Sequence, residues 1–224
     1  DDDLYFRAYL NSIWVAAIST VLCLLIGYPM ALAIARSPKD QQPLLLVLIM
    51  LPFWTSLLIR VYALVTILRQ DGVVNNVLLA VGVIDEPLLL LQTPFATYLG
   101  IVYTYVPFMI LPLYAVLEKQ DTSLLETSRD LGARPIISFL TITLPLSKAG
   151  VIAGSMLVFI PVVGEFVIPS MLSGNSTLMI GKVLWTEFFS NRDWPVASAV
   201  AVVMLIVLMI PIIIFQNQQS RERD

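Results

Sequence analysis

The chain has 224 residues, of which 58% are hydrophobic and 13% charged, and its mean hydropathy is +0.86. This composition excludes an ordinary soluble domain and is typical of a polytopic membrane protein. The formal net charge is −3, histidine is absent, and the single cysteine, Cys23, lies in an apolar run. Nucleic-acid binding, a disulfide framework, a metal site and histidine-based catalysis are therefore not expected within this chain.

Five apolar segments are long enough to cross a bilayer as helices, because a hydrocarbon core of ~30 Å takes ~20 helical residues. They are residues 10–35, 44–68, 94–117, 149–172 and 195–215. Several contain proline, which spanning helices tolerate because neighbouring helices satisfy the freed backbone groups. We expect an all-α polytopic membrane protein with a single transmembrane domain over residues 1–224.

Two longer segments between the spans are expected to be loops. Residues 71–93 carry acidic residues on both sides of a short apolar run, and this run is too short to cross the membrane and return. It predicts one helix that lies at the membrane interface. Residues 173–193 contain turn-forming residues and precede the last span.

Lysine and arginine are distributed unequally between the two sides of the membrane that this arrangement defines. One side holds eight of them and the other holds four, and the positive-inside rule places the richer side in the cytoplasm. The richer side has Arg36, Lys39, Lys119, Arg129, Arg134, Lys148, Arg221 and Arg223, and the other has Arg7, Arg69, Lys182 and Arg192. Residues 118–148, called the connector below, are then cytoplasmic, with the Asp1 end outside and the Asp224 end inside. Because five spans leave the two ends on opposite sides, we expect a further leading span ahead of this sequence.

The connector has the pattern of two short helices joined by a sharp turn. Ser123 and Glu126 have the Ser-x-x-Glu spacing of a capping box at the start of a helix. Gly132 stands where a residue with positive φ ends such a helix, and Pro135 stands where a new helix can begin. The second helix leads into the next span at Pro145. A rigid protrusion of this kind is suited to docking into a groove of a partner protein.

The connector also carries a family resemblance. Glu126-Thr127-Ser128, Gly132 and Ile142-Thr143-Leu144-Pro145 resemble the Glu-Ala-Ala, Gly, Ile-x-Leu-Pro signature, or EAA motif, of permease subunits of bacterial ABC importers. Thr127 and Ser128 depart from the two alanines of the family, but both are small. The resemblance implies that the residues that couple this chain to an ATPase are Glu126, Thr127, Ser128, Gly132, Ala133, Pro135 and Pro145.

The resemblance extends over essentially the whole chain. Segments 52–56, 58–62, 100–103, 105–109, 153–156, 164–169 and 191–195 are similar to the spermidine/putrescine permeases, and most similar to the permeases of putrescine systems. The implied fold is that of a type I ABC importer permease. Permeases of this family have six spans, which agrees with the further leading span expected above.

The resemblance implies an assembly in the bacterial inner membrane, with the Asp1 end of this chain in the periplasm. Its expected partners are a second permease subunit of different sequence, two copies of an ATP-binding subunit, a periplasmic polyamine-binding protein and membrane lipid. ATP and Mg²⁺ would be held by the ATP-binding subunits, so this chain is expected to bind no cofactor and to be no enzyme. Its implied role is to convert ATPase closure into alternating access for polyamines.

Glu165 and Arg60 are the only charged residues deep in the predicted spans, where charges normally face the interior of the bundle or an aqueous path. Glu165 is a candidate to meet the cationic amine of a polyamine in transit. Alternatively, it pairs with Arg60 or caps a broken helix near Pro161 and Gly164. Three aromatic residues are also candidates for the substrate path, namely Trp54, Tyr103 and Tyr105. Aromatic faces can attract the ammonium groups of a substrate, or they can pack against other helices.

Two other functions are compatible with parts of the sequence. A secondary transporter of cationic amines, driven by an ion gradient, would also use proline-broken spans and buried charges, but no internal repeat is evident. A membrane-embedded enzyme needs a cluster of catalytic residues at membrane depth, which Glu165 and Arg60 alone do not provide. The leading hypothesis is the translocation subunit of a polyamine ABC importer.

Overall fold

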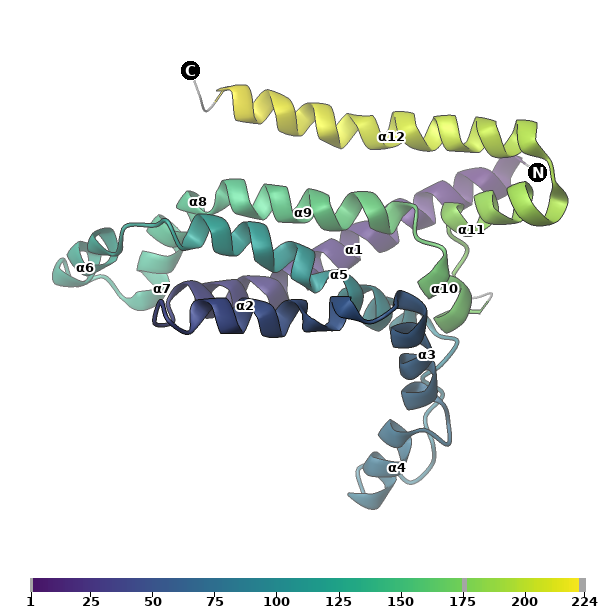
Figure 1. Cartoon of the computed structure of the whole chain (residues 1–224), viewed down its shortest axis with the longest axis horizontal. Helices are drawn as coiled ribbons and strands as arrows, with labels where there is room; N and C mark the ends of the chain where they lie inside the picture. Colours follow the sequence, from purple (N-terminus) through teal and green to yellow (C-terminus); the bar gives the residue numbers. More distant parts are fainter. Residues whose placement is uncertain (1, 175–176, 222–224) are drawn as a thin grey trace. The chain divides into compact units, whose positions relative to one another are not determined.

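The computed structural model describes residues 2–174 and 177–221, which form helices and connecting loops with no strand among them (Figure 1). The first half of the chain has α1 (Asp2–Ala35), α2 (Gln42–Met50), η1 (Leu51–Trp54), α3 (Leu57–Leu68), α4 (Val73–Ala80) and α5 (Pro94–Leu117). The second half has α6 (Thr122–Asp130), α7 (Pro135–Ser138), the π-helical turn η2 (Phe139–Thr143), α8 (Leu144–Leu146), α9 (Lys148–Val163), α10 (Val167–Leu172), α11 (Ile180–Trp185), the π-helical turn η3 (Thr186–Asn191) and α12 (Trp194–Arg221). The predicted locations of Asp1 and Asp224 fall outside the described residues.

Among the described residues, two helices are long and apolar enough to cross a membrane, α1 over Leu4–Ala35 and α5 over Pro94–Leu117. Two broken helix pairs meet the same test if each pair counts as one span. The first is Gln42–Trp54 with Leu57–Ala80, and the second is Pro135–Leu146 with Lys148–Val163, which bends by 66° at its break; α12 adds a shorter apolar helix, Trp194–Ile210. These helices overlap the five apolar segments of the sequence. That each segment crosses the membrane stays a prediction.

The chain packs as two compact units. The first unit comprises residues 1–19, 53–104 and 159–224, and the second comprises residues 20–52 and 105–158. The boundaries between them fall inside α1, α5 and α9, and beside Pro52 in η1. The expectation of a single transmembrane domain over residues 1–224 stays a prediction.

In the first unit, the segment predicted as the fourth span is interrupted between α9 and α10. The neighbouring helix α11 lies directly against this break, since a Cβ atom on Gly181 would collide with the carbonyl oxygen of Gly164. The backbone N–H of Ile180, at the start of α11, donates to Ser12 Oγ of α1 at 2.8 Å in the buried interior. The break is thus packed against other helices of its unit, which is where irregular backbone at membrane depth is tolerated.

In the second unit, α1, α5 and α9 approach closely around the buried side chain of Met109. A Cβ atom on Gly154 of α9 would lie 2.8 Å from Met109 Sδ and 3.1 Å from the Met109 carbonyl oxygen, and one on Gly27 of α1 would lie 3.1 Å from Met109 Cγ. Small residues at such positions allow membrane helices to pack with their backbones close together. The absence of a side chain at Gly154 is therefore a packing requirement.

Gly154→Ala is expected to destabilise the protein, because the added methyl group crowds both the Met109 side chain and the backbone of α5 at Met109. Overpacking of this kind typically destabilises by about 1–3 kcal/mol. Thermal unfolding of the detergent-solubilised protein measures the effect as a lower Tm. The control adds Gly154→Ala to the variant Met109→Ala. There the Tm should fall less than it does when Gly154→Ala is made in the wild type, because the contact with the Met109 side chain is gone. An unchanged Tm for Gly154→Ala would contradict the close packing.

Candidate functional site

The first helix of the connector, α6, is capped by Asp121 and not by Ser123. Asp121 Oδ1 accepts the backbone N–H of Ser123 at 2.9 Å, and the helix begins at Thr122. The predicted capping box of Ser123 with Glu126 is wrong, because the chain enters the helix two residues earlier than that motif requires. The N–H of Ser123, with help from its side chain, lowers the pKa of the Asp121 carboxyl. The charged cap is therefore present at neutral pH and is lost only when the pH falls through this lowered pKa.

The turn after α6 is a Schellman motif, as the position of Gly132 predicts. Gly132 has φ +80°, its N–H donates to the carbonyl of Arg129 at 2.8 Å, and the N–H of Ala133 donates to the carbonyl of Ser128 at 3.0 Å. These are the two hydrogen bonds that define the motif. Pro135 then opens α7, as expected. The turn thus has a single defined geometry.

A pair of serines holds the two connector helices together. Ser128 Oγ of α6 and Ser138 Oγ of α7 lie 2.7 Å apart and share a hydrogen bond, and the Ser138 side chain is buried. Thr127 instead bonds within its own helix, through Oγ1 to the carbonyl of Ser123 at 2.9 Å. The Ser128 departure from the family's alanine therefore forms a contact that alanine cannot make.

The base of the connector is anchored to α1 in the second unit. The rings of Tyr28 and Phe139 pack edge to face with centroids 5.5 Å apart. The Tyr28 hydroxyl is 2.7 Å from Ser147 Oγ, and both side chains are buried. Arg36 Nη2 donates to Thr143 Oγ1 at 3.5 Å. Sequence reasoning missed these anchors, since Arg36 entered it only as a positive charge and Tyr28 only as part of a span. Pro145, in α8, lies beside this base.

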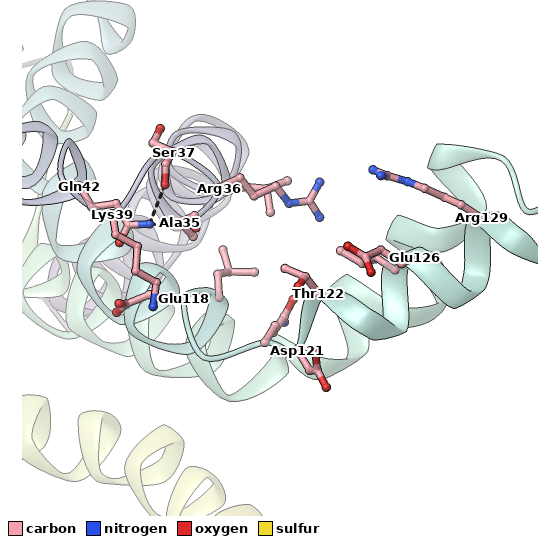
Figure 2. Close-up of a pocket in the computed structure, with 14 residues that line it drawn as sticks. Ala35, Arg36, Ser37, Lys39, Gln42, Glu118, Asp121, Thr122, Glu126 and Arg129 are labelled. Carbon is pink, nitrogen blue, oxygen red and sulfur yellow. Dashed lines mark hydrogen bonds between the residues drawn. The ribbon is translucent and has the colours of Figure 1, made fainter.

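A cavity of about 500 Å³ lies between α6 and the ends of α1 and α5 (Figure 2). Arg36 at the end of α1 and Arg129 on α6 extend into it from facing walls, with Glu126 beside them. The cavity is lined by Leu32, Ala35, Arg36, Ser37, Lys39, Gln42, Leu117, Glu118, Gln120, Asp121, Thr122, Leu125, Glu126 and Arg129. Of the predicted coupling residues, Glu126 is the one that lines this cavity.

The connector is polar in composition, but several of its large apolar side chains are exposed. Leu131, in the turn, is 84% exposed, and four further large apolar side chains on α6, α7 and η2 are also exposed: Leu124, Ile136, Ile137 and Leu140. Several exposed apolar side chains within one short segment are a candidate interaction surface. We call these five residues the apolar connector face.

Glu165 caps the broken helix in the first unit. The backbone N–H groups of Phe166, Val167 and Ile168 donate to its Oε1 at 3.1, 2.9 and 3.4 Å. The side chain is buried. The sequence offered three interpretations of Glu165, and the structure shows one of them, the cap on a broken helix. A carboxylate that accepts N–H groups of a helix start also matches the polarity of the helix.

Arg60 of α3 is buried without full hydrogen bonding. Its side chain is 9% exposed, its guanidinium lies 5.0 Å from the centre of the Phe53 ring, and its Nε and Nη1 have no hydrogen-bond partner in the described part of the chain. Arg60 makes no ion pair with a described residue, whereas Arg69 forms one with Asp71. The alternative in which Arg60 pairs with Glu165 is therefore not observed.

The three aromatic candidates have different surroundings. Trp54 is 81% exposed at the end of η1, Tyr103 is exposed on α5, and Tyr105 packs against Phe108 with ring centroids 6.0 Å apart. Within the described residues, no hydrogen bond or ring contact joins Trp54 to Tyr103. A substrate path along these residues stays a prediction.

Known proteins resemble this chain over nearly its whole length. A family model described as "Binding-protein-dependent transport system inner membrane component" matches residues 8–223. The chain is 42% identical over 214 residues to the spermidine/putrescine transport system permease protein PotB of Escherichia coli, with 96% of this chain and 78% of the relative covered. It is 41% identical over 212 residues to the protein of the same name from Haemophilus influenzae, with 95% and 74% covered.

Solved structures show the same fold at low sequence identity. A bacterial ABC transporter involved in the import of the acidic polysaccharide alginate has a chain that aligns with a TM-score of 0.73 at 20% identity, covering 99% of this chain and 80% of that one. The MetNI methionine ABC transporter, in an inward-facing conformation, gives a TM-score of 0.70 at 15% identity, covering 96% and 94%. The all-α architecture is therefore that of ABC importer permeases, as predicted.

Gly132→Ala is expected to loosen the connector turn, because a left-handed conformation is unfavourable by roughly 1–2 kcal/mol for residues with a Cβ. No atom lies within 4 Å of a Cβ built on Gly132, so backbone strain is the whole effect. Hydrogen–deuterium exchange over residues 122–138 measures it as faster exchange. Gly132→Asn is the matched control and should exchange more slowly than the alanine variant, since asparagine tolerates this conformation. Equal exchange in wild type and Gly132→Ala would contradict the role of the turn.

Proposed function

The chain belongs to the family of inner membrane components of binding-protein-dependent transport systems, and we propose that it is the transmembrane translocation subunit of an ATP-driven polyamine importer. The observation that carries the substrate class is the 42% identity, over 96% of the chain, to permeases named for spermidine and putrescine. Putrescine and spermidine are both within the proposed class. The family places the chain in the inner membrane, and the proposed orientation has the Asp1 end in the periplasm and the Asp224 end in the cytoplasm.

The proposed assembly contains three other kinds of subunit. They are a second permease of different sequence, two copies of an ATP-binding subunit that hold ATP and Mg²⁺, and a periplasmic polyamine-binding protein. One solved relative of the fold is an alginate ABC transporter in complex with a pentasaccharide-bound periplasmic protein, which supports the last of these partners. In this proposal the chain hydrolyses no ATP itself and binds no cofactor.

The connector is proposed as the element that couples the ATPases to the spans. Its apolar connector face is exposed, and in the proposed orientation this face lies on the cytoplasmic side, where a protein partner can bind to it. The Schellman turn at Gly132 and the Ser128–Ser138 hydrogen bond give the protrusion a fixed shape. Its base is joined to α1 through Tyr28 and to α9 through Ser147. A movement imposed on the connector would therefore reach the spans as a rigid displacement.

Glu165 is proposed to act on the substrate through the helix break that it caps. A polyamine cation that approaches the break would compete with the N–H groups of α10 for the Glu165 carboxylate. Substrate passage would then be linked to loosening of the cap. The buried position of Glu165 and the covering helix α11 support a role in gating.

The partner proposal predicts that the chain, solubilised in mild detergent from cells that produce the whole transport system, retains an ATP-binding subunit. Glu126→Ala should retain less of it, or should keep ATP hydrolysis while polyamine uptake falls, because Glu126 is the charged residue of the coupling motif. Asp130→Ala is the matched control, since Asp130 is exposed on the same helix but does not line the cavity. If Glu126→Ala retains the ATP-binding subunit and couples ATP hydrolysis to uptake as the wild type does, the connector has no coupling role. A wild-type chain that retains no ATP-binding subunit would contradict the importer assignment.

Two variants separate the structural role of Glu165 from a role in transport. In Glu165→Gln the side-chain oxygen can still accept the N–H groups of α10, but the negative charge is lost. We expect normal assembly and Tm with polyamine uptake reduced about tenfold, as a lost charge-assisted contact of roughly 1.4 kcal/mol would give. Glu165→Ala should lower both uptake and Tm, because it removes the cap as well. Normal uptake by Glu165→Gln would rule out the substrate role and leave only the cap.

A further inference from the structure

The cavity behind the connector is lined by charges of both signs that do not pair with each other. Three are cations, Arg36, Lys39 and Arg129, and three are carboxylates, Glu118, Asp121 and Glu126. In the described part of the chain none of these six side chains takes part in an ion pair. Charged side chains that line the same cavity without pairing leave room for a ligand that carries both charges.

The position of the cavity points to the membrane interface. Its walls are formed where α1 ends at Ala35 and where α5 ends at Leu117, which are also the ends of the two long apolar helices. Leu32 and Leu117 line it together with the charged groups, so the lining combines an apolar part with a strongly polar part. A site at the end of two spans lies at the level of lipid headgroups.

One wall of the cavity is ordered by a buried side chain, that of Gln42. Its Nε2 donates to the carbonyls of Ala35 and Ser37 at 3.2 and 2.9 Å, and the Tyr114 hydroxyl donates to its Oε1 at 3.0 Å. These hydrogen bonds join the end of α1, the start of α2 and α5. The cations of the α1 end are therefore presented from a defined backbone.

We propose that this cavity binds the headgroup of a zwitterionic phospholipid with a primary ammonium group, as in phosphatidylethanolamine. The phosphate would be held by the guanidinium and ammonium groups, and the headgroup ammonium would donate to the carboxylates, Glu118 first among them. Basic pockets between spanning helices bind the phosphate groups of anionic lipids, and the carboxylates in this cavity favour a headgroup that also carries an ammonium. A purely anionic headgroup would offer no cation to the three carboxylates, and a free polyamine would offer no anion to the three cations.

A lipid in this position would brace the connector against the spans. Its headgroup would touch Arg36 at the end of α1 and Arg129 on α6, which face each other across the cavity (Figure 2). The inference rests on the membrane location of the family and not on polyamine transport. The lipid site can therefore be absent while the chain transports polyamines. It can also be present if the chain transports a different substrate.

The test uses the assembled transporter, purified in detergent and stripped of lipid. Native mass spectrometry and Tm measurements follow titration with phosphatidylethanolamine, phosphatidylcholine and phosphatidylglycerol of identical acyl chains. Phosphatidylethanolamine should bind about tenfold more tightly than the other two, because only its headgroup combines a phosphate with an ammonium that donates hydrogen bonds. Equal binding of the three lipids would overturn the proposal.

Matched variants locate the binding. Glu118→Gln and Arg36→Gln should each weaken phosphatidylethanolamine binding about tenfold. Asp40→Asn and Lys119→Gln are the controls, because both residues are exposed nearby but neither lines the cavity, and they should bind as the wild type does.

Undiminished lipid binding by Glu118→Gln and Arg36→Gln would overturn the proposal. So would binding to the permease alone that disappears when the ATP-binding subunits are present, because a partner protein would then occupy the cavity.

Discussion

The backbone of a membrane helix must satisfy its hydrogen bonds within the protein, because the hydrocarbon core offers no water to replace a missing partner. This constraint accounts for the least regular part of the first unit. Where α9 stops and α10 starts, the freed N–H groups are taken by the Glu165 carboxylate. At the start of the adjacent helix α11, the N–H of Ile180 is taken by Ser12. Glu165 is a charged residue within an otherwise apolar segment, and its carboxylate satisfies the backbone N–H groups at the break.

In the proposed topology the connector lies outside the apolar core, where it must keep a fixed shape without the support of surrounding helices. Its turn is closed by backbone hydrogen bonds around Gly132, its helices are tied by Ser128 and Ser138, and its base packs on Tyr28. With its shape held from within, its apolar side chains can remain exposed for a partner. In the proposed role, rigidity at this point is what allows ATPase closure to act on the spans.

Much of this arrangement could be predicted from local sequence. The helical class, the Gly132 turn and the start of α7 at Pro135 follow from hydrophobicity and backbone preferences, and the EAA-like motif predicted the family, which the comparisons confirm. The cap of α6 could not be predicted, because Asp121, Thr122 and Ser123 are all good caps and only the incoming chain direction selects one. The cavity and the Tyr28 and Arg36 anchors join segments more than seventy residues apart, for which a single sequence gives no pairing signal.

The most direct test of the central claim is uptake of labelled putrescine and spermidine into proteoliposomes that contain this chain with its second permease and ATP-binding subunits. The polyamine-binding protein is supplied outside, and ATP is enclosed within. Uptake that requires both ATP and the binding protein, and that is unaffected when proton and sodium gradients are collapsed, is the predicted result. Uptake that follows an ion gradient in the absence of ATP would contradict the account and favour a secondary transporter.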